Sequence, residues 1–243
     1  QSRPLYDALA ALDVERLSPT EARVVTSHLR DAAHTGVALE GDEKARFNAI
    51  AMRLAELSTQ FSNHVLDATK AWSLTLRTGE EVAGLPASLL AQAAQAARAA
   101  GEDQATPEAG PWRMTLDYPC FGPVMMHSTR RELRELMYRA YISRASSGDK
   151  DNAPLIREIL SLRREKAGLL GFETFADLSL ASKMAGGVAQ VRTLMEQLRQ
   201  ASFTPAARDL AELNTMAAEA GATTPLRQWD VAFWAERLRE ERF

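Results

Sequence analysis

Apolar residues recur at every third or fourth position along most of this chain, which is the period of an amphipathic helix. The longest run covers residues 42–72 without a glycine or a proline. A helix of that length would extend about 45 Å at 1.5 Å per residue. Its apolar positions are Phe47, Ile50, Leu54, Leu57, Phe61, Val65, Ala68 and Trp72. This seam favours packing within one chain over a coiled-coil dimer, because it is short for a dimer.

The same period predicts several shorter helices. They cover about residues 5–12, 18–35, 86–100, 130–144, 155–170, 172–185, 188–201, 205–219 and 228–241. The helix over 155–170 is followed by Gly171, which can adopt the left-handed conformation that closes a helix. Phe172 can then fold back over the last turn. We therefore expect a helix, a defined stop at Gly171 and a second short helix.

Two segments carry the signal of a capping box, in which a serine or threonine precedes a glutamate by three residues. Ser18 precedes Glu21, with Pro19 at the first helical position, and Thr129 precedes Glu132. We expect a helix to begin at each.

Extended structure is predicted only in a few places. Residues 112–117 alternate between apolar and polar side chains, as a half-buried strand does. Residues 124–126 form a second short extended piece in this interpretation, and residues 73–77 are a further candidate. The proline-rich segment 101–111 is predicted to be a loop. The fold class that follows is mainly α, with a small β-hairpin-like element around residues 112–126.

Composition excludes several classes of function. The 29 basic and 32 acidic residues give a net charge of −3, so no overall field attracts nucleic acid or an anionic membrane. No apolar run approaches the roughly 18–20 residues of a membrane span. Cys120 is the only cysteine, which excludes an internal disulfide and suits a reducing compartment. We expect a cytoplasmic protein without a nucleic-acid or membrane partner.

The helix after Thr129 has a basic character. Its arginines are Arg130, Arg131, Arg134 and Arg139. Glu132 and Glu135 lie between them, and this alternation predicts a solvated, ion-paired face.

Candidate catalytic groups are few. The histidines are His28, His34, His64 and His127, and none has another histidine four residues on, the spacing that places two imidazoles on one metal. His64 and Asp67 share a helix face, and Cys120 lies seven residues before His127. A catalytic role for either pair is a weaker alternative than a structural one, because a nucleophilic cysteine needs a nearby base and a lowered pKa.

Several runs of residues are similar to one known family. They are Gln60–Asn63, Val65–Thr69, Arg134–Tyr141, Leu169–Glu173, Ala176–Asp177, Ser179–Leu180, Lys183–Ala185 and Trp229–Asp230. In this order they resemble the zinc oligopeptidase family that includes thimet oligopeptidase and neurolysin, and most closely its bacterial oligopeptidase A branch. The resemblance extends over roughly residues 45–236.

The resemblance implies a two-lobed, mostly helical enzyme that hydrolyses internal peptide bonds of short peptides with zinc held by a His-Glu-x-x-His helix. That motif is absent from this sequence, so we expect no catalytic residue and no metal ligand here. We expect residues 1–243 to be a helical fragment that lies upstream of the motif and forms one lobe of the enzyme. A sub-boundary within this fragment is expected near residues 101–111. The fragment would form a channel wall and scaffold, bind no zinc and need the downstream catalytic segment for activity.

Trp229, Asp230 and Phe233 are the candidate residues for the substrate channel or for packing between lobes. The family has two tyrosines after its Trp-Asp pair, where this chain has Phe233 and Trp234, so packing is the expected role. The chain opens without a methionine and ends without a helix stop, as expected for part of a longer protein. The main alternative is a free-standing helical binding or adaptor domain without peptidase activity.

Overall fold

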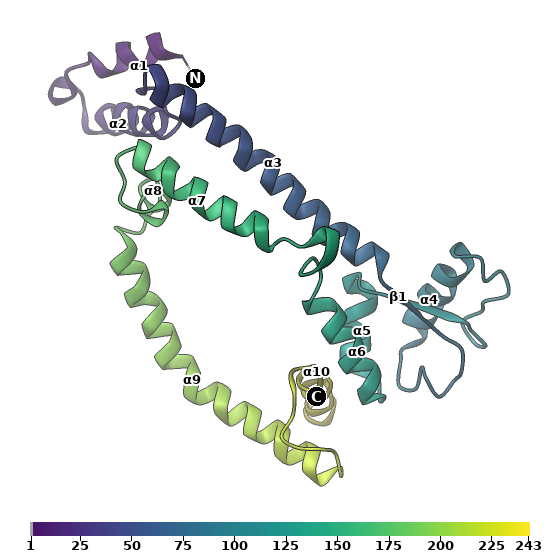
Figure 1. The fold of residues 1–243 in the computed structure, drawn as a ribbon. Helices are drawn as coiled ribbons and strands as arrows, with labels where there is room; N and C mark the ends of the chain where they lie inside the picture. The colour runs from purple at the N-terminus through teal and green to yellow at the C-terminus, as the bar shows by residue number, and fades with distance from the viewer. Residues whose placement is uncertain (1) are drawn as a thin grey trace. The chain divides into compact units, whose positions relative to one another are not determined.

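The computed structural model describes residues 2–243 and is mainly helical, as predicted (Figure 1). The α-helices are α1 Arg3–Ala10, α2 Pro19–His34, α3 Gly41–Ala71, α4 Ala87–Ala99, α5 Tyr118–His127, α6 Arg131–Ile142, α7 Ala153–Leu169, α8 Phe175–Leu180, α9 Val188–Glu219 and α10 Gln228–Arg242. Two short 3₁₀ turns cover Val14–Arg16 and Gly148–Lys150. The strands are β1 Ser73–Leu76 and β2 Trp112–Thr115. Within the described residues, no helix is both long and apolar enough to cross a bilayer.

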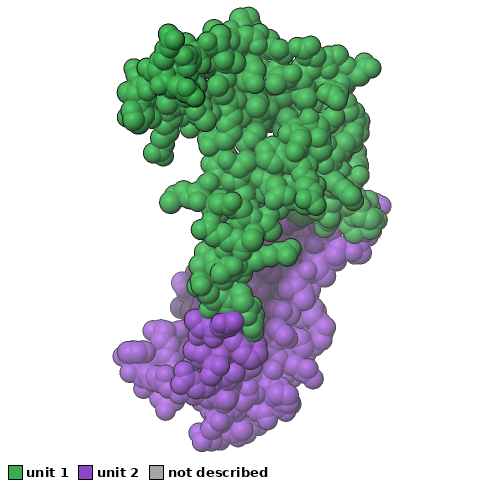
Figure 2. Space-filling model, turned by 90° about the vertical axis from the view of Figure 1, so that its left-hand side faces the viewer, with its two compact units in different colours: residues 1–61, 153–199 green, residues 62–152, 200–243 purple. Residues whose placement is uncertain are grey.

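The chain divides into two compact units (Figure 2). Unit 1 contains the residues up to 61 together with residues 153–199, and unit 2 contains residues 62–152 and 200–243. The divisions fall inside α3 and inside α9. The predicted loop 101–111 is the connection from α4 to β2 and lies within unit 2.

Unit 1 is built on the pairing of α3 with α7. Their shared core consists of Ile50, Leu57, Leu155 and Leu162. One exposed flank of this pair is joined by two bidentate ion pairs. Arg46 donates to Glu165 over 2.5 and 2.6 Å, and Arg53 donates to Glu158 over 2.6 and 3.0 Å. The predicted capping box of α2 is present, with Ser18 and Glu21 each accepting a hydrogen bond from the other's backbone N–H.

The stop at Gly171 is confirmed. Gly171 has φ +78°, its N–H donates to Gly168, and the N–H of Phe172 donates to Ala167. These are the two hydrogen bonds of a Schellman motif, which satisfy carbonyl groups at the end of a helix.

The core of unit 2 is formed by the small sheet and the helices α4, α5 and α6. β1 pairs with β2 in antiparallel register, with Ser73 opposite Thr115 and Leu76 opposite Trp112. Alternate residues of β2, Trp112 and Met114, are buried. The alanine-rich helix α4 packs against β2 and α5. Its buried face consists of Leu89, Ala93, Ala94 and Ala97.

The predicted extended piece at 124–126, and with it a hairpin over residues 112–126, is wrong, because these residues belong to α5. The candidate strand predicted at 73–77 is confirmed as Ser73–Leu76, and it is the partner of β2. Pro119 stands in the first turn of α5, where its missing N–H costs nothing, and buried Val124 and Met125 pack the helix against its neighbours. Tertiary burial here outweighs the breakers Gly122 and Pro123.

Two helix boundaries also differ from the predictions. α9 is one continuous helix with Pro205 inside it, where two helices were expected. Proline removes a single interior hydrogen bond, and the residues on either side extend the helix across it. α6 begins after Arg130, without a side-chain cap, because the hydroxyl and N–H of Thr129 both donate to the carbonyl of Ala83 instead.

The end of α7 provides a stability test. Gly171→Val should lower the free energy of unfolding by about 1–2 kcal/mol or more, because a β-branched residue is strained at φ +78°. Gly168→Ala should be neutral or stabilising by up to about 1 kcal/mol, because a Cβ there meets no atom within 4 Å. Chemical denaturation measures both variants. Equal effects at the two positions would contradict the left-handed stop.

Candidate functional site

The three predicted site residues lie together at the start of α10. Trp229 and Phe233 are each 9% exposed and Asp230 is 1% exposed. The backbone N–H of Arg227 donates to a carboxylate oxygen of Asp230 over 3.0 Å, which fixes the first turn of the helix. All three residues face α6, the helix that precedes them by about a hundred positions in the sequence.

The Asp230 carboxylate is held by two arginines of α6. Arg131 donates to it from Nε over 3.0 and 3.1 Å and from its terminal nitrogen over 2.7 Å. Arg134 donates to it over 3.0 Å, and also donates to the carbonyl groups of Ser128 over 2.6 Å and Trp229 over 3.1 Å. Arg134 is only 3% exposed. The prediction of a solvated basic face is therefore wrong for Arg134, which is buried, whereas Arg131 is half-buried and is ion-paired with the same carboxylate.

These contacts determine the ionisation of the Asp230 carboxyl and of its two arginine partners. Burial by itself would raise the pKa of the Asp230 carboxyl, but hydrogen bonds from Arg131, the Arg227 backbone and Arg134 hold that pKa below its ordinary value. Burial lowers the pKa of the Arg134 guanidinium, and the hydrogen bond to Asp230 raises the pKa of Arg131. Both arginines stay charged at neutral pH, because guanidinium groups are effectively always protonated in proteins.

Aromatic rings complete the contact between α6 and α10. The Arg134 guanidinium lies 4.3 Å from the ring centre of Phe233, and that of Arg139 lies 4.9 Å from Trp229. Tyr138 packs against Trp229 with ring centres 5.9 Å apart. Each cation over a ring adds an attraction of about 0.5–2 kcal/mol, depending on burial. The arrangement can hold two helices in a fixed orientation, and a role in a substrate channel or between lobes stays a prediction.

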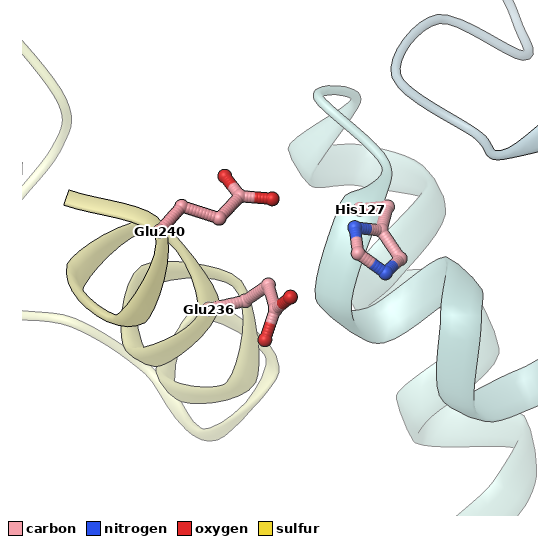
Figure 3. Close-up of side chains that lie close together, drawn as sticks. All are labelled: His127, Glu236 and Glu240. Carbon is pink, nitrogen blue, oxygen red and sulfur yellow. The ribbon is translucent and has the colours of Figure 1, made fainter. Parts of the chain in front are cut away.

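A second cluster brings together His127 of α5 with Glu236 and Glu240 of α10 (Figure 3). It is the one group of three potential metal ligands found among residues 2–243, and its ligand atoms all lie within 4.8 Å of one another. No sequence pattern predicts this cluster, since His127 and the glutamates are far apart in the chain. The i, i+4 spacing of the two glutamates was the only local signal.

Arginines already hold both of these carboxylates. Arg239 donates to Glu236 over 3.0 and 2.5 Å, and this hydrogen bond is the main reason that the pKa of Glu236 is lowered. Arg237 lies 2.8 Å from Glu240, and its terminal nitrogen lies 3.3 Å from Nδ1 of His127. A metal ion would have to displace these cations, so the cluster is better suited to ion pairing than to holding a metal.

The other candidate pairs are not brought together. Nδ1 of His64 lies 2.9 Å from the side-chain oxygen of Asn152, whereas Asp67 accepts a hydrogen bond from Lys150. Cys120 is buried against Met114, and burial raises the pKa of its thiol, the opposite of what a nucleophile requires.

Comparison with known proteins identifies the family. Residues 124–243 match the sequence model of the family described as Peptidase family M3. The whole chain is 45% identical to probable cytosolic oligopeptidase A from Arabidopsis thaliana, of which it covers 35%. It is 37% identical, over 99% of its length, to oligopeptidase A from Haemophilus influenzae, of which it covers 36%. Oligopeptidase A from Escherichia coli is 38% identical over 92% of this chain and is covered to 33%.

The chain belongs to peptidase family M3, which confirms the family predicted from its motifs. Within that family its similarity to oligopeptidase A extends over nearly the whole of its length. The chain spans about a third of the length of the curated relatives that it matches.

The buried ion pairs provide a stability test. Asp230→Asn should lower the free energy of unfolding by about 3–5 kcal/mol at pH 7, because it leaves two arginines without a compensating charge. Because folding lowers the pKa of Asp230, its contribution is present above the unfolded-state pKa of about 3.9. The contribution is lost as the pH falls through the lower folded-state pKa, so the difference between wild type and variant should shrink there.

Denaturant titrations at several pH values measure this difference. Asp7→Asn is the matched control, since it breaks an exposed pair on α1 and should cost less than about 1 kcal/mol. A cost for Asp230→Asn as small as that of the control would show that the buried pairs do not support the fold.

The second cluster provides a metal-binding test. Zinc binding by the 243-residue chain should be weak and should change by less than about twofold in His127→Ala, because stable zinc sites use three or four available protein ligands. Isothermal titration with zinc chloride measures it. Saturable one-to-one binding that disappears in His127→Ala would contradict this expectation.

Proposed function

We propose that residues 1–243 are the upstream, non-catalytic part of a zinc-dependent oligopeptidase that hydrolyses internal peptide bonds of short peptides. The observation that carries the proposal is the match itself. The chain aligns along its whole length with relatives named oligopeptidase A, yet it covers about a third of them and its sequence contains no His-Glu-x-x-His. The zinc and the chemistry then belong to the remainder of the protein.

The residues present here do not fit a catalytic zinc site. Such a site needs three protein ligands and an open position for water or substrate. The chain has four histidines, and the one cluster in its described part joins a single imidazole to two carboxylates that arginines hold. No step of the reaction is assigned to this chain.

The role that remains is a scaffold and channel wall. Support comes from the contact between α6 and α10, where the Asp230 carboxylate, two guanidinium groups and two aromatic side chains fix both helices. A wall must keep its shape while peptides pass, and a buried ion network with several directed bonds resists rotation of either helix. In the proposal, residues 1–243 form one lobe of the complete enzyme. The contact made by Trp229, Asp230 and Phe233 keeps the wall of that lobe in shape.

A cytoplasmic location remains part of the proposal. The single buried cysteine suits a reducing compartment. One relative from Arabidopsis thaliana is named as cytosolic, and another is named as chloroplastic and mitochondrial.

The proposal predicts a division of activity between the two parts of the enzyme. The 243-residue chain alone should not cleave an internally quenched peptide. The same chain, placed in the Arabidopsis relative instead of the matching segment, should give cleavage that a zinc chelator abolishes. Fluorescence release measures both. The relative without that segment is the control and should be inactive, since it lacks one lobe.

Chelator-sensitive cleavage by residues 1–243 alone would place the active site in this chain and overturn the proposal. If the relative without the segment cleaved peptides as well as the chimera did, the chain would not be needed for catalysis. That result would favour the alternative of a free-standing binding or adaptor domain.

A further inference from the structure

Unit 1 contains a groove with a volume of about 520 Å³, lined by residues of α3 and α7 and by Phe175 at the start of α8. It lies on a different flank of the helix pair from the ion pairs of Arg46 and Arg53, since none of the four ion-paired residues lines it. The apolar side chains that line it are Leu54, Phe61, Ile156, Ile159, Leu160 and Phe175. Its volume is in the range of pockets that bind small ligands, about 300–1,000 Å³.

The apolar lining is incompletely covered. Leu160 is 59% exposed and Ile156 is 45% exposed, one turn apart on the same face of α7. Large apolar side chains that are exposed together along a groove are typical of a binding surface. The stretch from residue 156 to residue 166 rises about 15 Å along the helix axis, which matches an extended peptide of about four or five residues.

Two cations stand at the end of the groove next to α8. The Arg163 guanidinium lies 4.9 Å from the ring centre of Phe175, and the Lys166 ammonium lies 5.2 Å from that of Phe47. In the part of the chain that the structure describes, neither cation forms an ion pair with a carboxylate. When a guanidinium lies against the face of an aromatic ring, its N–H groups point outward in the plane of the guanidinium. They therefore remain available to donate to a carboxylate.

The contrast between the two flanks is informative. On one flank Arg46 and Arg53 each have a carboxylate of α7 in bidentate contact. On the other flank, Arg163 and Lys166 contact aromatic rings, and within residues 2–243 neither is paired with a carboxylate. The dipole of α7 favours a cation near the end of the helix. It does not explain why both cations at the groove lack the carboxylate partner that the opposite flank supplies.

We propose that this groove binds the apolar segment of an oligopeptide that carries an acidic residue, with the carboxylate on Arg163 and Lys166. The nature of the ligand, an oligopeptide, rests on the proposed function. The apolar side chains would supply most of the affinity, and the two cations would fix the direction of the peptide and select acidic ones. The groove is then a place where this chain itself influences which peptides the enzyme accepts.

The test measures binding, not cleavage, so that it can succeed or fail independently of the proposed function. The probe is a fluorescein-labelled peptide of four leucines and alanines that ends in two glutamates. The comparison peptide ends in two glutamines. Fluorescence anisotropy with the 243-residue chain should show the acidic peptide binding at least tenfold more tightly, with a preference that weakens as salt is added.

Matched variants on α7 locate the site. Arg163→Glu should weaken binding of the acidic peptide at least tenfold, and Leu160→Ser should weaken both peptides. Arg164→Glu makes the same change in charge one residue further on, at an exposed position that does not line the groove, and should have little effect. Circular dichroism shows whether each variant is folded.

The outcomes separate the alternatives. Equal affinity for the two peptides, or equal effects of Arg163→Glu and Arg164→Glu, would overturn the assignment of the carboxylate to these cations. No binding of either peptide by the folded chain would overturn the groove as a peptide site. Concentration-dependent dimerisation that Leu160→Ser abolishes would show that a second copy covers the groove instead.

Discussion

The carboxylate of Asp230, almost completely removed from water between two guanidinium groups, is the interaction on which the arrangement of α6 and α10 depends. Removing charges from water costs several kcal/mol, and this cost is offset only where partner charges and hydrogen bonds lie in fixed positions. Arg134 also binds the carbonyl of Ser128, directly after α5, so the same side chain ties together the ends of three helices. α6 can make all these bonds at only one rotation about its axis.

The sequence predicted features whose cause is local. The period of apolar residues identified most of the helices, and Gly171 and the Ser18 capping box marked boundaries that the structure contains. It failed where burial overrode local signals. Gly122 and Pro123 suggest a break, but the apolar face of α5 is buried. Pro205 does not end α9 either, although the residues around it are exposed. The pairing of residues 73–76 with 112–115 joins distant segments, which no local pattern reveals.

The candidate site shows the same limit. Trp229, Asp230 and Phe233 stood out as an aromatic cluster around a motif, and they do lie together on one face of α10. Their partners could not be predicted, because Arg131 and Arg134 alternate with glutamates in a pattern that also suits a solvated face. Helical period reports which residues share a face, but not whether that face meets water or a buried carboxylate. His127 meets Glu236 and Glu240 only through the packing of α5 on α10.

The buried alanines of α4 limit which amino acids this part of the fold can accept. Ala94 and Ala97 have no exposed surface and Ala93 has 2%, so the helix backbone itself stands close to β2 and α5. Interiors are packed as densely as organic crystals, and each added methylene forces neighbours apart. Substitution is therefore limited here by volume more than by hydrophobicity. A leucine at Ala94 or Ala97, although apolar and a good helix former, would exceed the space that the alanine occupies.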